Sequence, residues 1–139
     1  MSFIWGLRKF ENVFEANRRL DSAFASEHWP VMRARAAERG AIFFAEADGK
    51  PVGWALVLDE PGDVFVEKAE RRHGFIAELF VEALARAQGH GRALIGACEA
   101  WTRGLNVLII NGLAGNDKAI AVYDRDGFAP YNLNLRKYL

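Results

Sequence analysis

The chain has only one cysteine, Cys98, among its 139 residues. A single cysteine cannot form a disulfide within the chain, which fits a reducing compartment. Cys98 falls on the apolar face of an expected helix, where a small buried side chain is favoured over a nucleophile. The three histidines, His28, His73 and His90, are scattered without the spacing of metal ligands, and no Cys/His cluster exists. We therefore expect neither a disulfide nor a metal site.

The chain also has no excess of charge of either sign and no long apolar run. It carries 18 basic and 18 acidic residues, for a net charge of zero with neutral histidines. A nucleic-acid-binding chain would carry an excess of Lys and Arg, so no nucleic-acid partner is expected. No apolar stretch approaches the roughly 20 residues of a membrane span, and the first residues do not have the pattern of a signal peptide. These features predict a cytoplasmic protein with no membrane partner.

Repeats, low-complexity tracts and Ser/Pro/Gly-rich linkers are missing as well. The composition is 51% hydrophobic and 26% charged, which is typical of a globular protein. A chain of this length can bury one sizeable core. We expect residues 1–139 to form a single domain.

The first half of the chain predicts an edge strand, two helices and a hairpin. Pro30 interrupts the helical pattern, and Gly40 is a good C-terminal stop for the second helix. Trp29, near this break, is favoured as a core residue over a substrate wall. Asp48-Gly49 is a strong hairpin turn signal. The expected segments are a strand at 2–8, helices beginning at Phe10 and spanning 31–39, and strands at 41–47 and 51–58.

The second half predicts a β-α-β crossover. The continuous apolar run from Val107 to Ile110 is typical of a strand covered on both faces. A charged loop is expected at 68–73, and Asn116 is a plausible N-cap. The expected segments are strand 75–81, helix 92–103, strand 107–113 parallel to the first, helix 116–124 and one or two strands over 128–139. The fold class is a mixed sheet in an α/β or α+β domain.

A glycine-rich turn, Arg86-Ala87-Gln88-Gly89-His90-Gly91, joins strand 75–81 to the helix. Its glycines let a backbone approach a ligand closely, and the N–H groups from Gln88 to Arg92 can form a nest for an anion. The turn is not a P-loop, because no Gly-Lys-Ser/Thr follows, and it lacks the third glycine of the dinucleotide fingerprint. Alone, it fits a phosphate site or a plain helix entry. We expect His90 to face solvent.

The motif Arg-x-x-Gly-x-Gly after an apolar strand resembles the acetyl-CoA signature of the GNAT superfamily of N-acetyltransferases. The continuation from Arg92 to Trp101 is similar to that family's third helix. The run from Asn116 to Phe128 resembles its Asn-x-x-Ala-x-x-x-Tyr-x-x-x-Gly-Phe element. The two motifs occur in the family's order, and the resemblance covers about residues 75–131. One departure is Glu82-Ala83-Leu84-Ala85, where many members carry a proline and a longer polar link.

The resemblance implies a GNAT-like fold, a central mixed and mostly antiparallel sheet with one parallel β-α-β crossover and flanking helices. It implies that the pyrophosphate of acetyl-CoA lies on the glycine turn. The pantetheine arm would lie where strands 75–81 and 107–113 splay apart, beside a bulge. The residues that the resemblance assigns to the cofactor are Leu79, Phe80, Val81, Arg86, Ala87, Gln88, Gly89, His90, Gly91, Arg92, Asn116, Ala119 and Tyr123.

The implied reaction is direct attack of a primary amine on the thioester in a ternary complex. It needs a neutral amine, a donor for the oxyanion and a proton for the leaving thiolate. Tyr123 matches the family's tyrosine that can supply this proton; the alternative is an aromatic packing role. Glu78 matches a place where some members carry a base. The alternatives are an ion pair with Arg71 or Arg72, or exposure at the sheet edge.

The sequence leaves the partners open. Polyamines, aminoglycosides, amino acids, peptide N-termini and protein lysines all fit as acceptors. The acidic residues between 59 and 70 favour a solvated loop over an amine-attracting patch, because Lys68, Arg71 and Arg72 lie among them. A non-catalytic acyl-CoA sensor and an interaction domain of the same fold are the alternative functions. The apolar pattern of residues 131–139 suits pairing with a second copy, which would give a homodimer.

Overall fold

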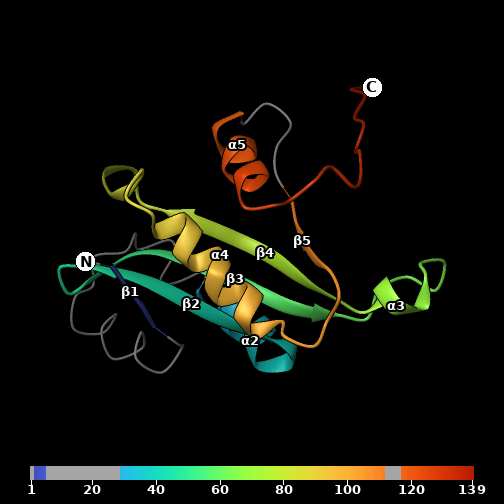
Figure 1. Ribbon diagram of the computed structural model, residues 1–139, viewed down its shortest axis with the longest axis horizontal. Coiled ribbons are helices and arrows are strands. Elements are labelled where there is room, and N and C mark those ends of the chain that lie inside the picture. The colour runs from blue at the N-terminus through green and yellow to red at the C-terminus, as the bar shows by residue number, and fades with distance from the viewer. Residues whose placement is uncertain (1, 6–28, 112–116) are drawn as a thin grey trace.

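The computed structural model describes residues 2–5, 29–111 and 117–139. Within them lies a five-stranded sheet in the order β1-β2-β3-β4-β5 (Figure 1). Neighbouring strands are antiparallel except β4 and β5, which are parallel. The predicted class, a mixed and mostly antiparallel sheet, is confirmed. The strands are β1 (Ser2–Trp5), β2 (Gly40–Ala47), β3 (Lys50–Glu60), β4 (His73–Val81) and β5 (Leu108–Ile110).

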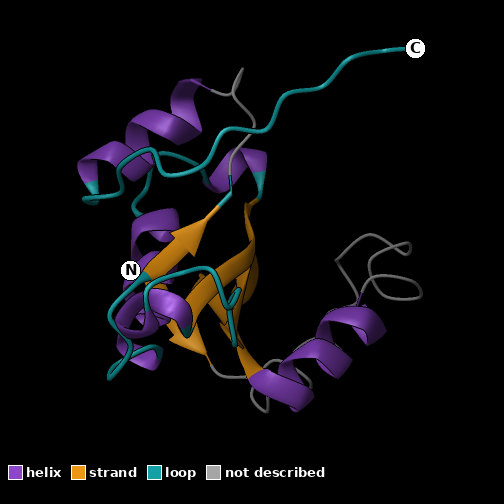
Figure 2. Ribbon diagram, turned by 90° about the vertical axis from the view of Figure 1, so that its right-hand side faces the viewer, coloured by secondary structure: helices purple, strands orange, loops and turns teal. Residues whose placement is uncertain are grey.

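Helices flank the sheet on both sides (Figure 2). Helix α4 connects β4 to the parallel strand β5, which confirms the predicted crossover. The helix expected from Phe10 lies outside the described residues. The helices are α2 (Trp29–Arg39), α3 (Lys68–Arg71), the short 3₁₀ turn η2 (Ala83–Ala85), α4 (His90–Trp101) and α5 (Asp117–Arg125). No helix in these ranges is long and apolar enough to cross a bilayer.

The turn between β2 and β3 is the one that the sequence predicts. Asp48 has φ 52° and Gly49 has φ 77°, and two successive positive φ angles match the right-handed twist of a two-residue hairpin. The register runs from Ala47 opposite Lys50 to Gly40 opposite Leu58. The period-two pattern of these strands places alternate residues on opposite faces of the sheet.

The face of the sheet that α2 covers holds one apolar core. Trp29 begins α2 and is 9% exposed, and its ring lies 5.8 Å from the ring of Phe44. This confirms the core reading of Trp29. Pro30 follows in the first turn of α2, where its missing N–H costs no hydrogen bond. The core consists of Trp29, Met32, Ala36, Ile42, Phe44, Leu56 and Leu58.

The opposite face holds a second core under α4. Cys98 is fully buried there, and burial raises the pKa of its thiol to about 12. The thiol therefore stays protonated and unreactive at neutral pH, which confirms the packing role expected for Cys98. This core consists of Ala45, Ala55, Val57, Ile76, Leu94, Ile95 and Cys98.

Three predicted segments differ from the structure. The charged loop at 68–73 contains α3. Strand β5 spans Leu108–Ile110, so it begins one residue later than expected, and residues 112–113 of the expected strand lie outside the described residues. Its residues are half-buried, because it is the edge strand of the described sheet. The final strands expected over 128–139 are wrong: this segment forms no regular structure and extends away from the sheet (Figure 1). An alternating pattern becomes a strand only beside a free strand edge, and the described chain brings none to it.

The α2-face core yields a stability prediction. Phe44 is fully buried and Phe65 is 94% exposed. We expect Phe44→Ala to lower the free energy of unfolding by about 3–5 kcal/mol, because it removes a packed ring and leaves a cavity. Phe65→Ala, the matched control, should change it by less than about 0.5 kcal/mol. Urea unfolding of both variants measures the difference, and equal losses would contradict this assignment of the core.

Candidate cofactor and active site

Strand β4 carries a bulge in its middle. Leu56 of β3 lies opposite Glu78 and its neighbour Val57 lies opposite Ile76, so Ala77 is an extra residue with no partner on β3. An extra residue of this kind bends its strand and disrupts the ladder locally. The bulge implied by the family resemblance is therefore present at Ala77.

Within the described residues, β5 pairs with β4 only along the first part of β4. Gly74, Phe75 and Ile76 lie opposite Leu108, Ile109 and Ile110. Among the described residues, no strand pairs with the outer edge of residues 77–81. This edge presents backbone N–H and C=O groups to an extended ligand, which can pair with it as an additional strand.

The glycine turn follows β4 and forms a nest of backbone N–H groups. Ala87 has φ 61° and Gly89 has φ 85°, and Gln88 between them does not have a positive φ. Alternation of this kind points successive N–H groups to one side, where they can bind an anion. The N–H of Ala93 donates to the carbonyl of Gly89 (3.0 Å). The N–H groups of the first turn of α4 therefore point out of the N-terminal end of the helix.

The turn also leaves room for a ligand. A Cβ built on Gly89 or Gly91 would meet no atom within 4 Å. A phosphate can therefore approach the backbone at both glycines, and any side chain there would fill the space. Because of this open space at Gly89 and Gly91, the turn can accommodate a diphosphate group.

Side chains around the turn brace its backbone. Arg86 donates from Nε to the carbonyl of Val81 (3.0 Å), and Gln88 donates from Nε2 to the carbonyl of Leu84 (3.4 Å). His90 is 2% exposed, so the expectation that it faces solvent is wrong. Its position as the first residue of α4 turns its ring inward, because the helix packs on the sheet. The backbone N–H of His90 can bind a ligand at the turn, whereas its buried ring does not face that ligand.

Glu78 lies on β4 beside the bulge. Because it pairs with Leu56, it lies on the face of the sheet that α2 covers, and it is half-buried. The two arginines proposed as its ion-pair partners bind elsewhere. Arg71 donates to the carbonyls of Val64 (3.0 Å) and Val66 (3.2 Å), and Arg72 forms a bidentate pair with Asp59.

Tyr123 lies on α5 and packs against the α4-face core. Its ring meets the ring of Phe128 edge to face at 6.1 Å, and its carbonyl accepts a hydrogen bond from the N–H of Phe128 (3.0 Å). Burial raises the pKa of the Tyr123 phenol above its ordinary value. The phenol therefore stays protonated at neutral pH.

The other residues assigned to the cofactor fall on both faces of β4 and on α5. Leu79 and Val81 pack toward α4, and the ring of Phe80 stacks on Trp54 at 4.4 Å on the opposite face. Ala119 lies half-buried in the first turn of α5. Asn116 lies outside the described residues.

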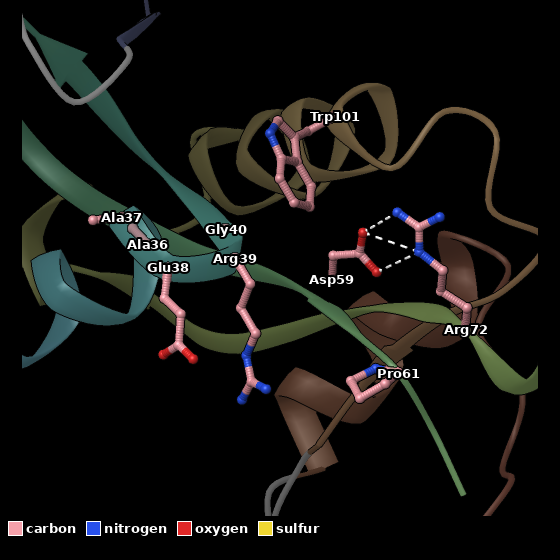
Figure 3. Close-up of a pocket in the computed structure, with 9 residues that line it drawn as sticks. All are labelled: Ala36, Ala37, Glu38, Arg39, Gly40, Asp59, Pro61, Arg72 and Trp101. Atoms are coloured by element: carbon pink, nitrogen blue, oxygen red, sulfur yellow. Dashed lines mark hydrogen bonds and ion pairs between the residues drawn. The ribbon is translucent and has the colours of Figure 1, made fainter. Parts of the chain in front are cut away.

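An open pocket of about 550 Å³ lies at the other end of the sheet (Figure 3). It opens beside Trp101, at the C-terminal end of α4, whereas the glycine turn lies at the N-terminal end. Three of its charged residues are paired: Arg72 binds Asp59 and lowers the pKa of that carboxyl, and Arg39 binds Glu60 at 3.1 Å. Asp59 and Glu60 lie in β3 and not in a loop. The described residues also contain no group of three or more ligands that could hold a metal ion.

Comparisons with known proteins agree with this geometry. The model of the acetyltransferase (GNAT) family matches residues 5–128. Comparison with the sequences of curated proteins gives no match. The aminoglycoside N-acetyltransferase AAC(6')-Iy in complex with CoA is 18% identical, with a TM-score of 0.78 over 100% of this chain and 95% of that chain. An aminoglycoside 6'-N-acetyltransferase from Acinetobacter haemolyticus (17%, 0.71, 99% of each chain) and a putative acetyl transferase from Pyrococcus furiosus (17%, 0.70, 100% of each) share the fold.

The chain therefore belongs to the GNAT family of acetyltransferases. Its activity is transfer of an acetyl group from acetyl-CoA to an amine nitrogen. Sequence reasoning found the strand, the turn and the helix of this site. It missed two features, the inward ring of His90 and the ion pair of Arg92 with Asp126. No local pattern marks either one, because both depend on how distant segments pack.

The open space at Gly91 yields a binding prediction. We expect Gly91→Glu to weaken CoA binding at least about 10-fold, because like charges a few ångströms apart near a protein surface repel by about 1–4 kcal/mol. The helix should tolerate the change, since a carboxylate in its first turn is favourable. Ala100→Glu, which adds the same charge at the far end of α4, is the control. Calorimetric titration with CoA measures both, and equal affinities would contradict the assignment of the turn.

Proposed function

We propose that the enzyme binds acetyl-CoA along the outer edge of β4 and catalyses direct attack of a primary amine on the thioester. The observation that supports this most is the junction of two features: a bulged strand edge at residues 77–81, with which no described strand pairs, and a nest of N–H groups at residues 87–92. A pantetheine arm needs the first and a pyrophosphate needs the second. In this proposal, the cofactor residues are those assigned from the sequence.

Glu78 and Tyr123 take different roles in the proposed reaction. Glu78 lies on the α2 face of the sheet, and Tyr123 packs against the α4-face core. Groups on opposite faces of the sheet can act on opposite sides of the thioester, one at the attacking amine and the other at the leaving sulfur. Glu78, directly or through a water molecule, accepts the proton of the amine, and Tyr123 donates a proton to the sulfur.

The bonds change as follows in the proposed reaction. The neutral amine nitrogen attacks the carbonyl carbon, and the oxygen gains negative charge, which a backbone N–H at the β4 edge stabilises. The C–S bond then breaks, and the sulfur takes the phenolic proton of Tyr123. The amine proton passes to Glu78, so the products are an N-acetyl amide and the free thiol of CoA.

The acceptor in this proposal is a small molecule that carries a primary amine. Two of the solved structures of similar fold are named as aminoglycoside acetyltransferases, and this supports a small amine in general. We also propose a cytoplasmic location, where the thiol of Cys98 and the free thiol product remain reduced.

Turnover with a panel of small amines tests the function. The purified chain is incubated with acetyl-CoA and polyamines, amino sugars, amino acids or short peptides, and mass spectrometry detects a gain of one acetyl group on the amine together with free CoA. Acetylation of one or more amines is the expected result. Tight CoA binding with no acetylated amine would favour the alternative, a non-catalytic acyl-CoA sensor.

The two catalytic assignments predict different pH dependences. We expect Glu78→Gln and Tyr123→Phe each to lower kcat by about 10²–10⁴-fold, typical of a lost general base or acid. The activity of Glu78→Gln should recover as pH rises, because the amine then loses its proton without help. Tyr123→Phe should not recover, because the thiolate still lacks its donor. Profiles of kcat from pH 6 to 10 measure both, and an unchanged kcat in either variant would contradict its role.

We also propose that the C-terminal segment pairs with a second copy of the chain. Residues 131–139 are all exposed, and Tyr131, Leu133 and Leu135 alternate with polar residues as in a half-buried strand. Pairing with a strand edge of a second copy would bury these side chains and give a symmetric dimer.

Paired substitutions test the dimer. We expect the double variant Leu133→Asp, Leu135→Asp to be a monomer by sedimentation velocity, because it places two charges in the apolar contact. The double variant Asn132→Asp, Asn134→Asp adds the same charge on the other face and should remain dimeric. A monomeric parent chain at micromolar concentration would rule the dimer out.

A further inference from the structure

Arg92, the residue of α4 that directly follows the glycine turn, extends its side chain to the end of α5. Its Nε lies 3.4 Å from Oδ1 of Asp126, which directly follows α5. The side chain of Arg92 is 82% exposed, whereas that of Asp126 is only 12% exposed. The ion pair therefore joins an exposed cation, whose residue contributes a backbone N–H to the nest, to a carboxylate that is nearly buried.

The backbone fixes the position of Asp126. Its N–H donates to the carbonyls of Val122 and Tyr123, both at 3.1 Å, and the next residue, Gly127, has φ 94°. These contacts close the last turn of α5 and hold the carboxylate in one place. Asp126 is thus the fixed partner of the pair, and Arg92 is the one with freedom to move.

One oxygen of the Asp126 carboxylate accepts no hydrogen bond from the described residues. Oδ2 of Asp126 is buried and has no hydrogen-bond partner among the described residues. Buried polar atoms without a partner are uncommon and call for an explanation. The contact to Oδ1 is also longer than the 2.7–2.9 Å of a strong charge-assisted hydrogen bond. The carboxylate of Asp126 can therefore accept a second and a shorter hydrogen bond from the guanidinium of Arg92.

An arginine can serve two anions at once. Its guanidinium has five N–H donors in a planar fork, and a carboxylate uses only two of them in a bidentate pair. With Nε and one terminal nitrogen on the two oxygens of Asp126, the other terminal nitrogen faces away from the carboxylate. Such a pair holds the plane of the guanidinium fixed and leaves donors for a phosphate.

We propose that Asp126 is a positioning residue for the cofactor: it holds the guanidinium of Arg92 beside the glycine turn, so that the outward donors of Arg92 bind the pyrophosphate. The inference rests on the proposed binding of acetyl-CoA at this turn. It adds a link between α5 and the nest that backbone N–H groups alone do not provide. Closing the bidentate pair also satisfies Oδ2, so binding of the phosphate and pairing of the carboxylate favour the same arrangement.

A double-mutant cycle with calorimetric titration of CoA tests the proposal. The proteins are the parent chain, Asp126→Asn, Arg92→Ala and the double variant. Asparagine has the shape of aspartate but no charge, so it keeps the packing and loses the hold on Arg92. We expect Asp126→Asn and Arg92→Ala each to weaken CoA binding about 10-fold. In the Arg92→Ala background, Asp126→Asn should change the affinity by less than about 2-fold.

The outcomes separate the two claims. A parent chain that does not bind CoA would overturn both the proposed function and this inference. A parent chain that binds CoA, with Asp126→Asn binding as tightly or more tightly, would overturn the inference alone. An equal loss in both backgrounds would also overturn it, because Asp126 would then act on the fold and not through Arg92. The last case would be accompanied by a lower melting temperature of Asp126→Asn.

A measurement on the parent chain needs no variant. The Nε–H proton of Arg92 is observable by NMR, and its exchange with water reports its hydrogen bond. We expect addition of CoA to slow this exchange at least about 10-fold, because the bidentate pair with Asp126 closes. Unchanged exchange in the CoA complex would overturn the proposal even if Asp126→Asn failed to fold.

Discussion

The site depends on the outer edge of the second half of β4. Within the described residues, β5 pairs with β4 as far as Ile76, and no described strand pairs with residues 77–81. The bulge at Ala77 begins this stretch. It leaves the two cores undisturbed, because Leu56 and Val57 on β3 keep their places on opposite faces.

This part of β4 also relates the site to the two faces of the sheet. Glu78, next to the bulge, lies on the α2 face, and Tyr123 reaches the α4-face core from α5. The glycine turn lies at the end of β4, so one strand leads from the proposed chemistry to the proposed phosphate site. Asp126 adds a contact between α5 and that turn through Arg92. In the arrangement that we propose, binding of the pyrophosphate and bidentate pairing of Arg92 with Asp126 stabilise each other.

The sequence was sufficient for features set by neighbouring residues. The Asp48-Gly49 turn, the alternation along β3 and the apolar stripe that buries Cys98 are local patterns, and each is present in the structure. The sequence was insufficient where a distant segment decides the outcome. His90 is buried because α4 packs on the sheet, and residues 128–139 form no strand because no edge lies beside them. No local pattern marks the ion pair of Asp126, since only the fold brings Arg92 to it.

The most direct test is to map CoA binding on the backbone of the whole chain. NMR spectra of the ¹⁵N-labelled chain, recorded during a titration with CoA, show which amides change their surroundings. We predict the largest shifts at residues 77–81 and 87–92, along the outer edge of β4 and in the glycine turn. Shifts confined to the groove beside Trp101 and Arg39, or no shifts at all, would contradict it.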